Sequence, residues 1–277
     1  MDAGGRTSER GCEHGGMGTT TQASAHPVPA AATRDAPARS RIVTVAAAKG
    51  GVGKTTLAYE LAAALGGVLV DLDWDAGGAT RMWGFDPTRA ARAPLLDALE
   101  RGPDGRPPRP KRRANQPPLV PAHPDLAASR IDADLVADCL GAWAAAWDAP
   151  YVVVDTHPGA NALTDGAMQV ADLVVVPVVL GAREMDALEA IVADLAGYRL
   201  LLAPTMVPPV PPKRFVDRLA GLAGGRITVA PPVSEHRWLR RRLRRSALVT
   251  QPNPGARVRA AAAELRAVAE SVEVACG

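Results

Sequence analysis

A short glycine-rich segment, Lys49 to Thr56 (KGGVGKTT), constrains the fold of this chain more than any other feature. It follows Ile42 to Ala47 (IVTVAA), an apolar run that predicts a buried strand, and it precedes a helix expected from about Lys54 to Leu65. Glycine lets the backbone turn tightly and aim its N–H groups at an anion, and the start of a helix adds partial positive charge. The segment therefore predicts a phosphate-binding loop, with Lys54 at the outer phosphates and Mg²⁺ on the Thr55 hydroxyl. The other expected contacts from this loop are Gly50, Gly51, Val52, Gly53 and Thr56.

Apolar strand-like stretches alternate with Ala- and Leu-rich helical stretches along the chain. Val68 to Asp73 (VLVDLD) follows the first helix, and this strand–helix–strand order implies parallel strands joined by a right-handed crossover. We expect Pro177 to loosen the ladder of its strand, because proline lacks a backbone donor. The fold class is therefore predicted as α/β, with a doubly wound and mostly parallel sheet flanked by helices. Further strands are expected at Leu119-Val120, Tyr151 to Asp155, Leu173 to Val179, Leu200 to Ala203 and Ile227 to Val229.

Composition divides the 277 residues into a tail and one domain. Residues 1–40 are rich in Gly, Ala, Thr, Ser and Pro and offer little apolar surface to bury, so we expect a disordered tail before a domain over 41–277. Within that domain, residues 101–118 (RGPDGRPPRPKRRANQPP) are rich in proline and arginine, which predicts an exposed loop or a flexible insertion.

The cysteines and the hydropathy exclude several classes of protein. The three cysteines lie far apart, without a CxxC pair or a Cys/His cluster, so neither a zinc site nor a disulfide framework is indicated, and a reducing cytoplasm is expected. The longest apolar run, Leu173 to Leu180, is too short to span a bilayer.

The phosphate loop departs from the strict Walker-A pattern at its first position, which is Ala48, and carries an additional lysine, Lys49. In this respect the chain resembles the ParA/MinD superfamily of deviant Walker-A ATPases, whose signature is K-G-G-x-G-K-[ST]. The resemblance implies an Mg²⁺-dependent ATPase that forms an ATP-dependent homodimer. In such a dimer Lys49 would contact the nucleotide of the partner subunit, and its charge would offset the charge that develops during phosphoryl transfer.

Two further motifs carry the resemblance. Val70 to Thr80 (VDLDWDAGGAT) resembles the second motif of the superfamily, which implies that Asp73 positions the attacking water, although Trp74-Asp75 replaces the usual Pro-Gln. Taken alone, the Asp71 and Asp73 pair would indicate solvated carboxylates at a strand end, but the spacing after the phosphate loop favours the motif. Tyr151 to Gly159 (YVVVDTHPG) resembles the Walker-B and switch segment, which implies that Asp155 holds Mg²⁺ through water. His157 replaces a usual proline there, either as a residue tolerated in a turn or as a sensor of γ-phosphate or pH.

The resemblance extends over about residues 41–250 and implies adenine contacts late in the chain. Leu201 to Met206 (LLAPTM) and Val229 to Ser234 (VAPPVS) occupy the corresponding positions, which assigns these contacts to Thr205 and Pro231.

An arginine-rich segment follows, and Ser234 to Arg245 is expected to form a helix with Leu239 and Leu243 facing the core. Its exposed side would suit contacts with a phosphate backbone without base reading. A merely solvated charged face is the alternative. The candidate DNA-binding residues are Arg237, Arg240, Arg241, Arg242, Arg244 and Arg245.

Among members of the superfamily, the chain is most similar to ParA-type partition ATPases. That similarity implies non-specific DNA binding, a ParB-like centromere-binding or other stimulating partner, and a nucleoid-associated location in the cytoplasm. Two alternatives remain: an ATP-switched scaffold or cargo-positioning protein whose arginines meet an acidic protein surface, and a MinD-like regulator that cycles on a membrane. The final stretch, Ala261 to Gly277, lacks an apolar face with basic flanks, which favours DNA over a membrane.

Overall fold

The computed structural model describes residues 40–75, 78–89, 94–242 and 246–277. Its centre is a seven-stranded sheet in the order β3-β2-β4-β1-β5-β6-β7, and every neighbouring pair of strands is parallel. The strands are β1 (Arg41–Val45), β2 (Val68–Asp71), β3 (Leu119–Val120), β4 (Tyr151–Asp155), β5 (Leu173–Val178), β6 (Leu200–Pro204) and β7 (Ile227–Val229). The predicted fold class is confirmed.

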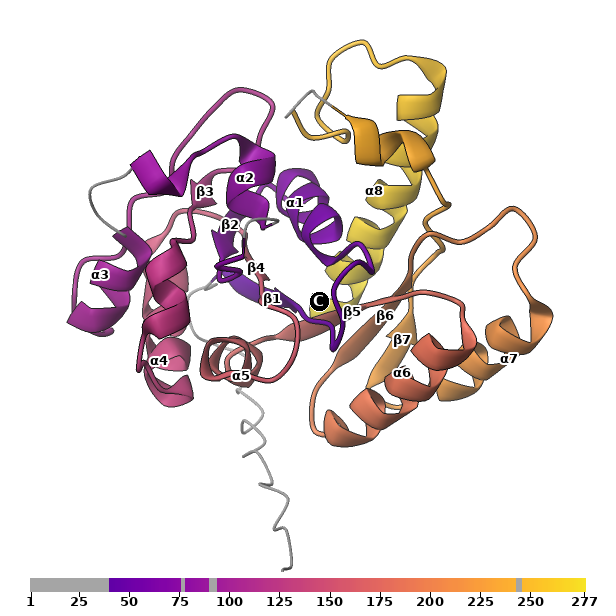
Figure 1. Ribbon diagram of the computed structural model, residues 1–277, viewed down its shortest axis with the longest axis horizontal. Coiled ribbons are helices and arrows are strands. Elements are labelled where there is room, and N and C mark those ends of the chain that lie inside the picture. The colour runs from indigo at the N-terminus through magenta and orange to yellow at the C-terminus, as the bar shows by residue number, and fades with distance from the viewer. Residues whose placement is uncertain (1–39, 76–77, 90–93, 243–245) are drawn as a thin grey trace, which may run out of the picture.

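Helices cover both faces of the sheet (Figure 1). One face packs against α1 (Lys54–Ala64), α2 (Ala79–Trp83) and α8 (Ala256–Cys276). The other packs against α3 (Pro94–Arg101), α4 (Ala133–Ala146), α5 (Ala162–Gln169), α6 (Ala182–Asp194) and α7 (Lys213–Leu222). Short 3-10 helices lie at Pro87–Arg89, Pro124–Ala128 and Arg237–Arg241. Among the described residues, no helix is both long enough and apolar enough to cross a membrane.

Alternation along the strands explains how both faces are filled. Successive side chains of a strand point to opposite faces, so Val43 and Val45 pack toward α1 and α8, whereas Ile42 packs toward α4. In β1 the first residue is exposed and the other four are buried. Strands with two buried faces read as continuous apolar runs, which is why the sequence marks them clearly.

Pro177 lies inside β5 and pairs in register with Ala203 of β6. The carbonyl of Val175 accepts a hydrogen bond from the backbone N–H of Ala46, on the β1 side. Because backbone groups alternate between the two neighbouring strands, those of Pro177 also face β1. The strand pairing with β1 ends at Val175, so the missing donor of proline falls beyond the paired region. The ladder therefore loosens only on the β1 side, and pairing with β6 continues.

The predicted strand ends lie within two residues of the observed ones, and two other predictions differ from the structure. Ser40, placed in the tail by composition, is buried, and its hydroxyl donates to the carbonyls of Ala144 and Ala149, so the ordered domain includes it. The rest of the predicted tail lies outside the described residues. The predicted α-helix over Ser234 to Arg245 is wrong in its described part, because only the 3-10 helix Arg237–Arg241 forms and Arg242 is extended. At this end the Arg242 side chain contacts Glu60 of α1, as described below.

Candidate nucleotide-binding site

The glycine-rich loop joins the carboxyl end of β1 to the start of α1. Gly51 and Gly53 have φ of 83° and 89°, in the left-handed region that residues with a Cβ disfavour. No side chain of the described residues caps the N-terminus of α1. The first backbone N–H groups of the helix are therefore available to an anion, as the sequence predicted.

Lys54, the first residue of α1, is only 5% exposed and points into the carboxyl edge of the sheet. Its Nζ lies 2.8 Å from Oδ1 of Asp155 and 3.6 Å from Oδ2 of Asp73, and it also donates to the carbonyl of Thr156. β4 lies between β1 and β2, with Asp155 in register with Val45 and Asp71. The parallel register thus brings three predicted site residues, Lys54, Asp73 and Asp155, to one point.

Asp155 is fully buried, and its Oδ2 is one of the buried polar atoms without a hydrogen-bond partner among the described residues. Burial raises the pKa of this carboxyl, against the opposing effects of the Lys54 ammonium and a hydrogen bond from the Thr55 hydroxyl. An unpartnered carboxylate oxygen beside a threonine hydroxyl offers hard oxygen ligands of the kind that Mg²⁺ takes. The residues present therefore fit a magnesium ion.

Asp71 ends β2 and Asp73 lies two residues beyond it, and the two carboxyls have different environments. Asp71 is fully buried and accepts the backbone N–H groups of Asp73 and Thr80, at 3.0 and 2.6 Å. Burial, assisted by the nearby charge of Asp155, raises the pKa of Asp71 to about 8. Asp71 therefore shapes the loop after β2, whereas Asp73 faces Lys54 and lines the cavity.

Three residues at positions that depart from the superfamily pattern meet beside this point. The rings of Trp74 and His157 stack with centroids 4.0 Å apart, and Nε2 of His157 lies 3.2 Å from Oδ2 of Asp75. The backbone N–H of Asp75 in turn donates to Asp73 over 3.1 Å. Sequence reasoning noted these departures one at a time and missed their contact, because nothing local links positions 74 and 157.

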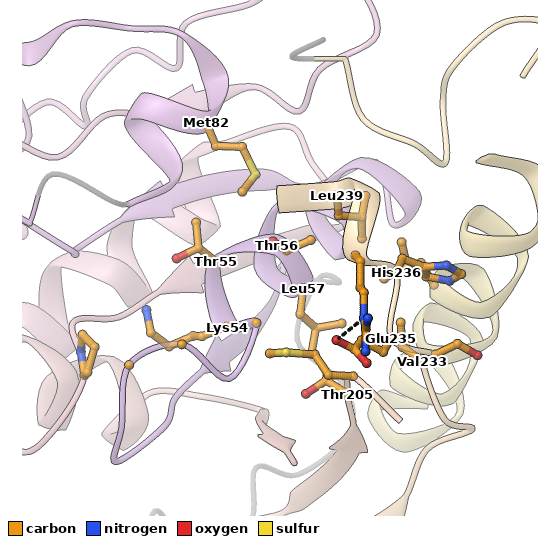
Figure 2. A pocket seen from close by; sticks show the side chains of 18 of the residues that line it. Lys54, Thr55, Thr56, Leu57, Met82, Thr205, Val233, Glu235, His236 and Leu239 are labelled. Carbon is orange, nitrogen blue, oxygen red and sulfur yellow. Dashed lines mark hydrogen bonds and ion pairs between the residues drawn. The ribbon is translucent and has the colours of Figure 1, made fainter. Parts of the chain in front are cut away.

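A cavity of about 640 Å³ opens beside the loop. Figure 2 shows Lys54 and Thr55 on one side of it and Val233, Glu235 and His236 on the other. One end of it holds the loop and Asp73, and the remainder is lined by apolar side chains together with the polar residues Ser234 to Arg237. Such a mixture suits a phosphorylated ligand with a ring that is partly apolar. Predicted site residues in its wall are Gly50, Gly51, Gly53, Lys54, Thr55, Thr56, Asp73 and Thr205. Lining residues that the sequence did not indicate include Met82, Met206, Val233, Glu235, Leu239 and Leu265.

The remaining predicted contacts lie elsewhere. Lys49 is exposed and lies outside this cavity, beside Val52 in a small hollow against α6. The carbonyl of Val52 accepts the hydroxyl of Thr205 over 2.8 Å, so Thr205 supports the loop as well as lining the cavity. Pro231 is not brought to the cavity and instead lines a separate one of about 460 Å³ beside α8.

The candidate DNA-binding arginines are only partly described. The side chain of Arg237 is 86% exposed at the cavity rim, 3.4 Å from Glu235. Arg242 turns inward, with its side chain 16% exposed, 3.5 Å from Glu60 and bonded to the carbonyl of Ser246. Only the backbone of Arg240 and Arg241 is described, and Arg244 and Arg245 lie outside the described residues. Arg242 therefore holds the segment in place and is not free on the surface.

Comparison with known proteins places the chain in a family. Residues 40–201, more than half of the chain, match a family model described as an AAA domain. No curated protein gives a significant match.

Several solved structures share the fold. A variant of McdA from Cyanothece in complex with ATP is 18% identical, with a TM-score of 0.66 over 86% of this chain and 97% of that chain. A plasmid partition protein from Borrelia burgdorferi is 19% identical, with a TM-score of 0.64 over 85% and 99% of the two chains. The MinD cell division protein from Aquifex aeolicus is 18% identical, with a TM-score of 0.62 over 85% and 97%. The chain therefore belongs to the AAA domain family, and it has the fold of the ParA/MinD superfamily of ATPases.

Proposed function

We propose that this chain is an Mg²⁺-dependent partition or positioning ATPase that closes into a homodimer on ATP, binds DNA non-specifically, and is reset by hydrolysis. The observation that carries the proposal is Lys54, buried between Asp155 and Asp73 at the mouth of the glycine loop. A lysine held in this way can exchange its carboxylate partners for phosphate oxygens when a nucleotide enters the adjoining cavity.

Each residue then has a defined role. The loop N–H groups and Lys54 bind the β- and γ-phosphates. Magnesium held by Thr55 and, through water, Asp155 would supply charge neutralisation at the β- and γ-phosphate oxygens. Asp73 lies close enough to Lys54, at 3.6 Å, to orient a water near the terminal phosphate. The apolar part of the cavity accommodates the base.

The homodimer is supported by the position of Lys49. Its side chain is exposed and lies outside its own cavity, although it is only five positions before Lys54 in the sequence. A cation so placed is available to a nucleotide held by a second copy of the chain, as the superfamily resemblance implies. A dimer would also explain why the charge of Lys49 is kept at an exposed edge of the loop.

DNA is the proposed surface that the ATP-bound dimer occupies, with a ParB-like or other partner stimulating its release. The exposed Arg237 supplies a cation suited to phosphate-backbone contacts, and the sequence places Arg240, Arg241, Arg244 and Arg245 after it. Such contacts give binding that is independent of base sequence and falls steeply with salt.

The test is DNA binding measured across a salt series with ATP, with ADP and without nucleotide, alongside light scattering to follow dimerisation. The proposal predicts a dimer, and tight, salt-sensitive DNA binding, in the presence of ATP but not with ADP or without nucleotide. Arg237→Glu is the variant of choice, because reversing Arg242 would also break its contact with Glu60. DNA binding that is equal in all three nucleotide states, or absent in all three, contradicts the proposed cycle.

A further inference from the structure

The proline- and arginine-rich stretch 101–118 is an exposed loop, as predicted, but it is fastened to the domain at several points. The indole N–H of Trp147 donates to the carbonyl of Pro108 over 3.3 Å, and that of Trp83 donates to the carbonyl of Pro117 over 2.9 Å. Lys111 and Leu119 exchange two backbone hydrogen bonds, at 2.7 and 2.9 Å. The loop therefore has a defined path, and its prolines limit the backbone further.

Aromatic side chains beneath the loop hold two of its cations. The ammonium of Lys111 lies 4.4 Å from the ring centroid of Phe85, and the guanidinium of Arg113 lies 4.6 Å from that of Trp83. Three further cations, Arg106, Arg109 and Arg112, are exposed and have no ion pair within the part of the chain that the structure describes. Asp104 is the single acidic residue of the loop. The loop thus presents a fixed surface of positive charge.

The loop is also joined to the stretch that directly follows the arginine-rich segment. The carbonyl of Asn115 accepts the backbone N–H of Ala247 over 2.8 Å and the hydroxyl of Thr250 over 3.2 Å. In Figure 1 this loop arches above α2 and approaches the chain that precedes α8. The basic loop and the stretch after the arginine-rich segment therefore adjoin, although more than a hundred residues separate them in sequence.

A buried glutamate ties the second of these segments to the phosphate-loop helix. Glu60 of α1 is 1% exposed and accepts the backbone N–H groups of Leu248 and Val249, at 2.7 and 3.2 Å, besides its contact with Arg242. Arg242 therefore anchors the arginine-rich segment on α1 through Glu60. Asn115 anchors the loop on the stretch that Glu60 also holds.

We propose that the loop 101–118 is part of the surface that takes the phosphate backbone of duplex DNA, together with the arginine-rich segment, of which Arg237 is the exposed side chain that the structure describes. This inference rests on the proposed function and adds a second, independent element to it. The backbone that carries the loop cations is already held in place, so it loses little conformational entropy when they bind phosphates. Neutralising phosphates through both segments at once raises the number of counterions released and so the affinity.

The composition of the loop favours nucleic acid over an acidic protein. Stable protein interfaces rely on aromatic or aliphatic anchors at their centre. The aromatic residues near this loop, Trp83, Phe85 and Trp147, all face its underside and are engaged with it. Its exposed residues are arginines with Asp104, Ala114 and Asn115, which offer charge and polar groups and no large apolar anchor.

The test compares two double variants that change the net charge of the protein by the same amount. The first variant, Arg109→Glu with Arg112→Glu, reverses two positive charges of the loop. The matched control is Arg199→Glu with Arg226→Glu, at exposed positions beside the starts of β6 and β7. Fluorescence anisotropy of a labelled duplex with Mg-ATP measures affinity across a salt series. We expect the loop variant to lose about tenfold or more in affinity and about two units of salt slope. The control should bind as the wild type does, and ATP affinity should be equal in all three proteins.

The outcomes separate this inference from the proposed function. If the wild type binds DNA with ATP and the loop variant binds as tightly as the control, the loop is not part of the surface and only this inference fails. If the wild type binds DNA in no nucleotide state, both fail. Polyglutamate that competes with the duplex at equal charge would overturn the choice of nucleic acid, because the surface would then not distinguish a phosphate backbone from an acidic polypeptide.

Discussion

The imidazole of His157 lies flat against the indole of Trp74, with ring centroids 4.0 Å apart and ring planes 4° apart. The same imidazole contacts Asp75 over 3.2 Å. This stack joins the loop after β2 to the loop after β4, and both loops lead directly from the carboxylates that surround Lys54. The two loops are therefore held relative to each other at the place where the terminal phosphate is expected.

His157→Ala tests whether this stack positions Asp73. Loss of the ring should loosen the loop that carries Asp73 and lower kcat by about tenfold while leaving the affinity for Mg-ATP unchanged, since small displacements of a positioning group slow the chemistry. Steady-state ATPase assays and calorimetric binding separate the two quantities. His123→Ala is the matched control, because His123 also lies 3.2 Å from an aspartate but outside the cavity. An equal loss in both variants would contradict a positioning role.

Asp73→Asn should preserve nucleotide binding and abolish most turnover. The amide keeps the size of the side chain but cannot orient or deprotonate water as a carboxylate does, so kcat should fall by about a hundredfold or more. Single-turnover hydrolysis of bound ATP measures this step. Asp125→Asn, at an exposed aspartate outside the cavity, should hydrolyse ATP as the wild type does. Unchanged turnover in Asp73→Asn would remove Asp73 from the mechanism.

Glu60→Ala should destabilise the fold. The change leaves the buried backbone N–H groups of Leu248 and Val249 without an acceptor, and each such group costs about 1–3 kcal/mol. We therefore expect the free energy of unfolding, measured by urea denaturation, to fall by about 2–4 kcal/mol. Glu189→Ala, at an exposed glutamate that pairs with Arg218, should have a much smaller effect. Equal effects would show that the Glu60 contacts do not hold the segment.

Glu264 predicts a dependence of stability on pH. Burial acts to raise the pKa of Glu264, but hydrogen bonds from Ser234 and His236 outweigh it and hold the pKa below the usual 4.5. A carboxyl with a lowered pKa in the folded state stabilises the fold above pH 4.5, and that stability is lost as the pH falls through the folded pKa.

Glu264→Gln should therefore be less stable than the wild type by about 1–2 kcal/mol at neutral pH, and the difference should shrink as the pH is lowered below 4.5. Urea denaturation at a series of pH values measures it. Glu270→Gln, at an exposed position of the same helix, serves as the control and should follow the wild-type curve. A difference that stays constant with pH would contradict the assigned hydrogen bonds.

The elements that local sequence determines were predicted well, and those that depend on distant partners were not. The strands are buried on both faces, so Val-rich runs such as Tyr151–Asp155 mark them directly. The loop before Lys54 is recognisable because its glycines and helix start are contiguous. The arginine-rich segment was predicted as an α-helix from its local periodicity, which gave no sign that Arg242 would turn inward to Glu60, nearly two hundred residues away in the sequence.

A signal for Glu60 was present in the sequence. It is the one acidic residue within Leu57 to Leu65 (LAYELAAAL), a stretch apolar enough to be buried all round. A carboxylate inside such a helix requires hydrogen-bond donors from elsewhere, although the sequence does not say which. The stacking of Trp74 on His157 gave no comparable signal.

The central claim is that the loop and Lys54 bind the phosphates of ATP, and isothermal titration calorimetry with Mg-ATP tests it most directly. The wild type should bind ATP with one site per chain, and Lys54→Ala should lose at least about tenfold in affinity, since a charge-assisted contact of this kind contributes at least about 1.4 kcal/mol. Lys213→Ala, which removes an exposed lysine from a pair of the same 2.8 Å length, should bind as the wild type does. Absence of ATP binding by the folded wild type, or equal binding by Lys54→Ala, would contradict the claim.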